Sequence, residues 1–352
     1  MRFAKVESKY YCGIDLHSRS MYISVMDKEG EVLFHRNMPN DFDIFKNYVE
    51  RFQPNMAVGV ESSCYYYWLA DACKEAGIPF YLGHAYYMKA INGGKVKNDR
   101  VDSKKIADLL RCNLFPLAYD YPREMRPTRD LLRRRHFFMW RRASTYSHLQ
   151  VICTQHGIID LEPKIVKDKL RRNQLLKLFD DKELQMMISL DLMFIEFLDP
   201  VVAQLERHIT QKAKHHNHLD YQLLRSIPGV GEILSLIILY ETHDIKRFKT
   251  VQRYSSYCGV VKCERESGGK KIAAKNTKIR NPYLKWAFGE VILKAQVSEP
   301  EIGKLYKRLK SKYGLGRAKS IIAHRFAVAT YFMLKNKQTF DAERFVKTSK
   351  YK

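Results

Sequence analysis

Four acidic residues stand where apolar packing gives no reason for a carboxylate. Asp15 interrupts one short apolar run, Glu61 ends another, and Asp99 and Asp102 open a helical stretch. A separation of three residues puts Asp99 and Asp102 on one face of a helix. In phosphodiester chemistry, two Mg²⁺ ions about 4 Å apart, held by such side chains, bridge the attacked and departing oxygens. The four carboxylates therefore predict a magnesium site.

Each of these residues also has a structural interpretation. Asp15 can bond to local backbone, Glu61 can cap the next helix, and Asp102 can act as an N-cap. Singly, each is more often structural. Only their placement together in one fold favours a catalytic role.

The region before about residue 115 predicts an α/β domain that would bring the carboxylates together. The expected strands are 10–16, 21–27, 32–34, 56–60 and 80–82, and the expected helices are 41–51, 66–76 and 103–112. The order β-β-β-α-β-α-β-α is that of a ribonuclease-H-like fold.

The charge of the chain points to a polyanionic partner. Its 352 residues include 62 Lys and Arg against 38 Asp and Glu, a formal charge of +24. Such an excess repels itself unless a polyanion neutralises it, so nucleic acid is the expected partner. A membrane is not expected, because the chain has neither a spanning apolar stretch nor a signal-peptide pattern. Seven scattered cysteines without a Cys-x-x-Cys pair indicate reduced thiols and a cytoplasmic, nucleoid-associated protein.

A basic helical stretch follows, from Arg123 to about Ile159. Phosphate contact is the favoured role of its arginines, and the candidates are Arg133, Arg134, Arg135, Arg141 and Arg142. The interleaved Phe137, Phe138 and Trp140 can anchor the helix in a core or stack on bases, and core packing is favoured.

Residues 182–212 carry a heptad pattern. One position of the repeat holds Ile188, Ile195, Val202 and Ile209, and the companion position holds Leu184, Leu198 and Leu205. This pattern favours a two-stranded coiled coil and hence a homo-oligomer, a dimer to tetramer. Pro200 is expected to kink or split the helix. The alternative is a helix that packs on its own chain.

The last region begins near Tyr221. Ile227-Pro228-Gly229-Val230-Gly231 between two helical stretches predicts a helix–hairpin–helix, in which Gly229 and Gly231 let phosphate approach backbone N–H groups. Glycine pairs also make ordinary turns.

These motifs together resemble the DEDD-type insertion-sequence transposases. Gly13-Ile14-Asp15, Gly59-Val60-Glu61-Ser62 and Lys97-Asn98-Asp99-Arg100-Val101-Asp102 are similar to the three acidic motifs of that family. Ile227–Gly231, Arg247-Phe248, Tyr257-Cys258-Gly259 and Glu266-Ser267-Gly268-Gly269-Lys270 are similar to its C-terminal motifs. Arg280 departs from the family, which has a glycine there, and this leaves open how that loop meets nucleic acid. The resemblance covers nearly the whole chain.

The resemblance implies a RuvC-like domain whose Mg²⁺ ligands are Asp15, Glu61, Asp99 and Asp102. It further implies recombination guided by a bridge RNA that pairs with target and donor DNA. Ser267 would attack DNA and form a covalent phosphoserine, with half-sites supplied by different protomers of a tetramer. Lys270 and Lys271 follow that serine in a loop that phosphate can approach, so both are candidates for nucleic-acid contact.

We therefore expect an α/β plus all-α protein in three parts. These are a RuvC-like domain with a basic helical extension (1–160), a coiled-coil region (161–220) and a helical transposase domain with the catalytic serine (221–345). One rival is a metal-dependent nuclease or Holliday-junction resolvase in which water attacks. The other is a non-catalytic nucleic-acid-binding descendant, against which the presence of all five candidate catalytic residues speaks.

Overall fold

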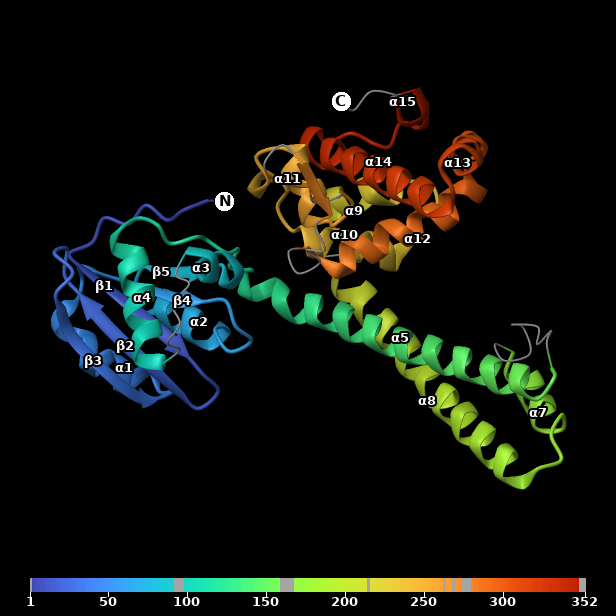
Figure 1. Cartoon of the computed structure of the whole chain (residues 1–352), viewed down its shortest axis with the longest axis horizontal. Helices are drawn as coiled ribbons and strands as arrows, with labels where there is room; N and C mark the ends of the chain where they lie inside the picture. Colours follow the sequence, from blue (N-terminus) through green and yellow to red (C-terminus); the bar gives the residue numbers. More distant parts are fainter. Residues whose placement is uncertain are drawn as a thin grey trace. The chain divides into compact units, whose positions relative to one another are not determined.

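The chain forms two compact units, Met1–Arg123 and Glu124–Lys352 (Figure 1). A computed structural model describes residues 2–91, 98–158, 168–213, 216–261, 264–267, 270–273 and 280–347. For residues 90, 169, 170, 173, 213, 264–267 and 270–273 it describes only the backbone. The division at Arg123 differs from the expected boundary at 160. The reason is that the basic helix α5 (Arg126–Gln155) packs along helix α8 (Lys182–Ala213) of the second unit.

The first unit is built on a five-stranded sheet. Its strands are β1 (Tyr10–Leu16), β2 (Ser20–Met26), β3 (Val32–Pro39), β4 (Met56–Glu61) and β5 (Phe80–Gly83). They lie in the order β3-β2-β1-β4-β5, with β1, β2 and β3 antiparallel and with β4 and β5 parallel to β1. The expected ribonuclease-H-like order is therefore present.

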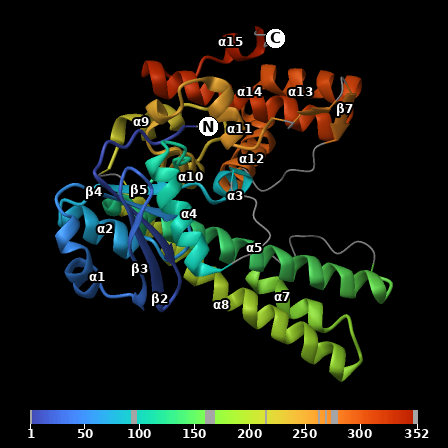
Figure 2. The same cartoon turned by 60° about the vertical axis from the view of Figure 1, so that its left-hand side comes forward.

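Helices cover both faces of this sheet (Figure 2). Because side chains alternate along a strand, Ile14 and Val60 point to one face, where helices α1 (Phe42–Val49) and α2 (Tyr67–Glu75) bury them. The opposite face is covered by α4 (Asp99–Arg111). Helix α3 (Ala85–Ile91) follows β5 and was not predicted from the sequence.

Two glycines bring α4 directly onto the sheet. A Cβ at Gly13 would lie 2.2 Å from the carbonyl oxygen of Ser103 and 2.3 Å from the amide nitrogen of Ala107. Gly59 pairs with Gly13 in register, and a Cβ there would lie 2.4 Å from Leu110 Cδ1. The absence of side chains at both positions therefore sets the depth of α4, and with it the position of the helix's first turn.

In the second unit, α5 and α8 run antiparallel. Arg135 pairs with Glu206, Arg142 with Asp199 and His148 with Asp191. Residue numbers therefore decrease along α8 as they increase along α5. The heptad positions Ile188 and Ile195 are fully buried in one cluster with Leu149 and Ile152 of α5. This corrects the expected coiled coil between chains, because the seam is filled within one chain. Helix α8 also continues through Pro200 without a break.

Helices dominate the rest of this unit. They are α7 (Lys169–Leu176), α9 (His218–Arg225), α10 (Glu232–Thr242), α11 (Val251–Tyr257), α12 (Pro282–Ser298), α13 (Pro300–Tyr313), α14 (Leu315–Asn336) and α15 (Ala342–Lys347). A hairpin of β6 (Glu264–Ser267) and β7 (Lys270–Ala273) precedes α12. None of the described helices is long and apolar enough to span a membrane. The six cysteines within the described residues are all free thiols, and Cys263 lies outside those residues.

Candidate metal site and nucleic-acid interface

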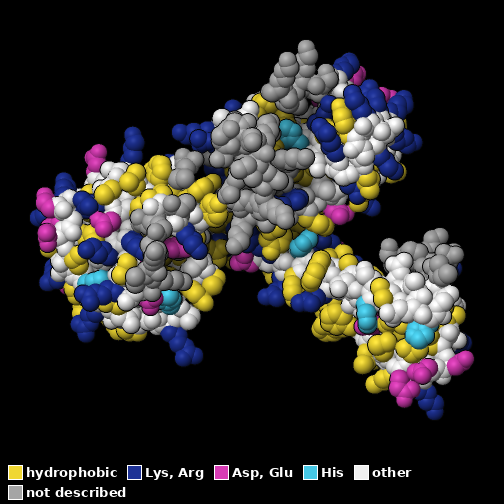
Figure 3. Space-filling view, viewed as in Figure 1, with side chains coloured by type: hydrophobic (Ala, Val, Ile, Leu, Met, Phe, Trp, Pro, Cys, Tyr) yellow, Lys and Arg dark blue, Asp and Glu magenta, His cyan; other side chains and the backbone are white. Residues whose placement is uncertain are grey.

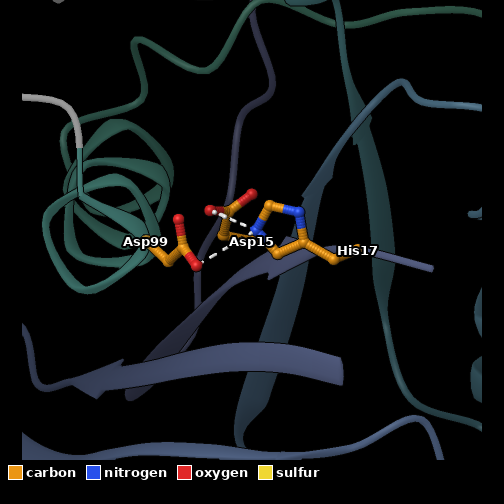
Figure 4. A group of neighbouring side chains, drawn as sticks. All are labelled: Asp15, His17 and Asp99. Carbon is orange, nitrogen blue, oxygen red and sulfur yellow. Dashed lines mark ion pairs between the residues drawn. The ribbon is translucent and has the colours of Figure 1, made fainter. Parts of the chain in front are cut away.

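Asp15 and His17 form the strand side of the candidate site. They are two residues apart at the end of β1, so their side chains share the face that α4 covers. The Nε2 of His17 lies 3.2 Å from Asp15 Oδ2 and 3.4 Å from Asp99 Oδ2 (Figure 4). Among the described residues, these three form the one group of His, Cys, Asp or Glu whose ligand atoms all lie within 4.8 Å of one another.

The first turn of α4 supplies the helix side. Asn98 caps this helix, with its side-chain oxygen accepting from the backbone N–H of Arg100 at 3.0 Å. Asp99 and Asp102 therefore both lie inside the first turn, and the helix begins four residues before the expected start at 103. Asp102 is not the N-cap, which removes its structural interpretation.

The electrostatics of the site suit a cation. Burial raises the pKa of Asp15, the nearby charges of Asp99 and Asp102 raise it further, and His17 opposes the rise. Lys105 Nζ lies 3.3 Å from Asp102. Carboxylates gathered in this way repel one another, and oxygen donors at this spacing are those that hard divalent ions prefer. The residues present therefore fit the divalent metal that the fold implies.

Glu61 lies at the end of the neighbouring strand. Ile14 pairs with Val60, so Asp15 and Glu61 are the next residues along the parallel strands β1 and β4, and both point to the α4 face. The Glu61 residue is exposed and is not part of the close group of Asp15, His17 and Asp99. The sequence analysis placed Glu61 at the correct strand end, and its role as a metal ligand stays a prediction.

Ser267 belongs to the second unit. It ends β6 and pairs with Lys270 across the hairpin. The side chains of Ser267, Lys270 and Lys271 lie outside the described residues, as do Gly268 and Gly269.

The sheet order and the carboxylates at its strand ends define a ribonuclease-H-like enzyme domain. Residues 12–157 match the model of a DEDD transposase of IS110 elements, and residues 221–307 match that of the Transposase IS116/IS110/IS902 family. The chain belongs to this family of insertion-sequence transposases.

Two curated relatives agree with this assignment. The chain is 22% identical to the transposase for insertion sequence element IS1111A of Coxiella burnetii, over 69% of this chain and 68% of that protein. It is 29% identical to a mini-circle protein of Streptomyces coelicolor named as a transposase for IS117, over 36% of this chain and 31% of that protein.

Three of the five candidate phosphate-binding arginines are used inside the chain. Arg133 pairs with Glu241 at 2.7 Å, Arg135 with Glu206 at 2.5 Å and Arg142 with Asp199 at 2.6 Å. Their guanidinium groups hold α5 to α8 and α10, which argues against free phosphate contact. Arg134 and Arg141 are exposed, and neither pairs with a carboxylate among the described residues.

The aromatic residues beside these arginines are not buried, contrary to the favoured expectation. Phe137 is 40% exposed and Trp140 is 59% exposed. The guanidinium of Arg141 lies 5.1 Å from the centroid of the Phe137 ring and 5.3 Å from that of Trp140, and Arg134 lies 5.7 Å from the Phe137 centroid. We name these four residues the arginine–aromatic stripe. It offers flat faces and positive charge together.

The two glycines between α9 and α10 differ in their surroundings. Gly229 has a φ of +78°, and a Cβ there would lie 2.7 Å from the amide nitrogen of Ala295 in α12. It therefore serves internal packing, which argues against the predicted phosphate contact. Gly231 precedes α10 and has no neighbour within 4 Å of such a Cβ, so it alone is open to approach.

Sequence reasoning missed two features. His17 was overlooked because one histidine two residues after Asp15 carries no motif of its own, although the alternation of β1 already places the two side chains together. The second feature is a basic surface on α13 and the start of α14 (Figure 3), made of the exposed Lys304, Lys307, Arg308, Lys310, Lys312, Arg317 and Lys319. Its density of Lys and Arg between 304 and 319 was a readable signal.

Proposed function

We propose that this transposase cuts and rejoins the DNA of an insertion sequence through a covalent phosphoserine at Ser267. The observation that carries the proposal is the gathering of Asp15, Asp99 and Asp102 at one strand end of a ribonuclease-H-like sheet. A carboxylate cluster of this kind is what phosphodiester chemistry requires. The match of both halves of the chain to one transposase family supports the same activity.

Asp15, Glu61, Asp99 and Asp102 are the proposed holders of Mg²⁺. The bound cation would supply positive charge to the phosphate oxygens as negative charge develops on them. The hydroxyl oxygen of Ser267 forms a bond to phosphorus while the bond from phosphorus to a deoxyribose oxygen breaks. Rejoining reverses the exchange with a new deoxyribose oxygen. The number of phosphate ester bonds is unchanged, so no ATP is needed.

Nucleic acid is proposed to meet the chain on its exposed basic surfaces. The α13 surface and Gly231 suit phosphate, while the arginine–aromatic stripe suits unpaired bases. Lys270 and Lys271 remain proposed contacts beside Ser267. A bridge RNA that pairs with target and donor DNA would supply sequence recognition, as base pairing does in other guided systems.

We also propose that the chain is a homo-oligomer, a dimer to tetramer, through a face of α8 that the described part of the chain leaves open. Met186, Leu190, Met193 and Phe197 lie on this face at helical spacings of four and three, and each is 53–63% exposed. Hydrophobic side chains are exposed along the arm of α5 and α8 (Figure 3). A second copy is the proposed occupant, because identical helices with this spacing can interdigitate about a two-fold axis.

A denaturing-gel test for protein–DNA adducts separates this proposal from its rival. The wild-type chain with its copurified RNA, DNA ends and Mg²⁺ should give a covalent adduct, and Ser267→Ala should give none. Thr277→Ala is a matched control, since it removes another hydroxyl from the same region. Mg²⁺-dependent cutting that persists in Ser267→Ala, without an adduct, would assign the chain to the nucleases or junction resolvases instead.

A further inference from the structure

The geometry points to His17 as a direct nitrogen ligand of the divalent metal, beside Asp15 and Asp99. This inference rests on the proposed metal site and adds a ligand of a different chemical kind. His17 follows β1, two residues after Asp15 and on the same face, with its side chain about half exposed at 48%. Its ring therefore reaches the site from the solvent side, where a metal and its waters would enter.

The spacing of the three ligand atoms suits one ion. Two ligand atoms at right angles on an ion with bonds of 2.0–2.1 Å are about 3 Å apart. The Nε2 of His17 lies 3.2 Å from one oxygen of Asp15 and 3.4 Å from one oxygen of Asp99. Both separations are therefore close to neighbouring corners of a single coordination shell.

Hydrogen bonding alone accounts less well for this arrangement. A histidine Nε2 carries at most one proton, and here it faces carboxylate oxygens from two different elements. One N–H directs one good hydrogen bond, which leaves the second carboxylate facing the same nitrogen. A cation with Nε2, Asp15 and Asp99 as ligands satisfies all three groups at once.

A nitrogen ligand changes which ion the site prefers. Mg²⁺ favours oxygen donors only, whereas affinity for an imidazole-containing set rises from Mn²⁺ to Co²⁺. The site should therefore bind Mn²⁺ and Co²⁺ more tightly than a site made of carboxylates alone. Replacing His17 should shift the preference back toward Mg²⁺.

The test uses the full chain loaded with Mn²⁺ and measured by pulsed electron paramagnetic resonance. Wild-type protein should show coupling of the Mn²⁺ electron spin to a ¹⁴N nucleus. Labelling the histidines with ¹⁵N should replace this signal by a ¹⁵N coupling. His17→Gln, which replaces the imidazole by an amide of similar reach, should lose it. His35→Gln is the matched control, because the ring of His35 bonds Arg100 O at 3.0 Å and Ser103 Oγ at 3.3 Å rather than the carboxylates.

Titration of the same proteins with Co²⁺ and Mg²⁺ gives an independent measure. In His17→Gln the ratio of Co²⁺ to Mg²⁺ affinity should fall by at least about tenfold, since even outer-shell partners of a metal are worth that much. Mn²⁺ that binds in an Asp15-dependent manner but shows no ¹⁴N coupling would overturn the role of His17 and leave the proposed metal site standing. Mn²⁺ binding that Asp15→Asn does not weaken would overturn the metal site itself.

Discussion

Arg133 and Glu241 join the start of α5 to the end of α10 through a buried ion pair. Arg133 Nε donates to Glu241 Oε1 at 2.7 Å, and the carboxylate side chain is 3% exposed. Arg129 donates to the same carboxylate at 2.8 Å, and the Asn281 side chain donates to it at 2.7 Å. Because Asn281 also caps α12, a single carboxylate ties three helices together.

Glu241→Gln should therefore destabilise the second unit strongly. The substitution leaves two partly buried guanidinium groups without their counter-charge, and removing one partner of a buried ion pair typically costs about 3–5 kcal/mol. Urea unfolding followed by circular dichroism measures the loss. Glu301→Gln removes an exposed, solvent-screened pair with Lys304 and should cost far less. Equal losses in the two variants would contradict the role of Glu241.

The same pair predicts a pH dependence. Burial acts to raise the pKa of Glu241, but Arg133 and Arg129 outweigh it and lower the pKa below the ordinary 4.5. A lowered folded pKa contributes stability that is present above the unfolded pKa and disappears as the pH falls through the folded one. The stability difference between wild type and Glu241→Gln should thus be constant above about pH 5 and shrink below pH 4.5. A difference unchanged down to pH 3 would be inconsistent with the pair.

Gly13→Ala should disturb the metal site without touching a ligand. The added methyl group meets backbone atoms of Ser103 and Ala107, which cannot rotate away. The first turn of α4 must then move from β1, so Mn²⁺ affinity should fall and stability should drop by about 1–3 kcal/mol. Isothermal titration and thermal unfolding measure both. Gly316→Ala, with no neighbour within 4 Å, should change neither.

Trp140→Ala should weaken the binding of single-stranded nucleic acid by about 1–3 kcal/mol if one base stacks on the ring. In Trp140→Ala the salt dependence of binding should stay nearly constant. In Arg141→Ala the slope of log affinity against log salt concentration should fall by the equivalent of about one phosphate contact. Fluorescence anisotropy over a range of salt concentrations measures both quantities. Val151→Ala removes another exposed apolar side chain from α5 and serves as the control. Equal binding by Trp140→Ala and Val151→Ala would remove the stripe from the interface.

Met193→Glu with Phe197→Glu should prevent self-association. The two charges fall in the middle of the proposed contact, where a second copy would bring four carboxylates together. Sedimentation velocity should show a dimer or larger species for wild type and a monomer for the double variant. Ala203→Glu adds a charge at an exposed position of α8 that lies off the face of Met193 and Phe197, and it should leave assembly intact. A monomeric wild-type chain would contradict the proposed contact.

Local pattern was sufficient to predict the sheet. The apolar runs of β1 and β4 are set by neighbouring residues, so both strands and the strand-end positions of Asp15 and Glu61 were readable. The Gly13–Gly59 register joins residues far apart in the chain and was not predicted. The predicted start of α4 was four residues too far along the chain, because Asp102 is as suitable an N-cap residue as Asn98.

The roles of the basic helix were less readable. The acidic partners of Arg133, Arg135 and Arg142 lie between 57 and 108 residues away in the chain. Composition marks all five arginines alike, and only tertiary packing separates those that stabilise the fold from those left for phosphate. The heptad of α8 was ambiguous for the same reason, since a seam filled by α5 and one filled by another chain need the same residues.

Helices α5 and α8 run antiparallel and form a helical hairpin. The part of this hairpin beyond Arg142 and Asp199 can therefore be shortened separately from the rest of the unit. The chain leaves along α5 and returns along α8. At the base, Arg135–Glu206 joins these two helices and Arg133–Glu241 joins α5 to α10. Matched deletions of seven residues from each helix beyond Arg142 and Asp199 would shorten the hairpin while the base keeps its contacts. Insertion or deletion can thus change the length of this hairpin, and with it the proposed contact face of Met186, Leu190, Met193 and Phe197, while the ion pairs at its base stay in place.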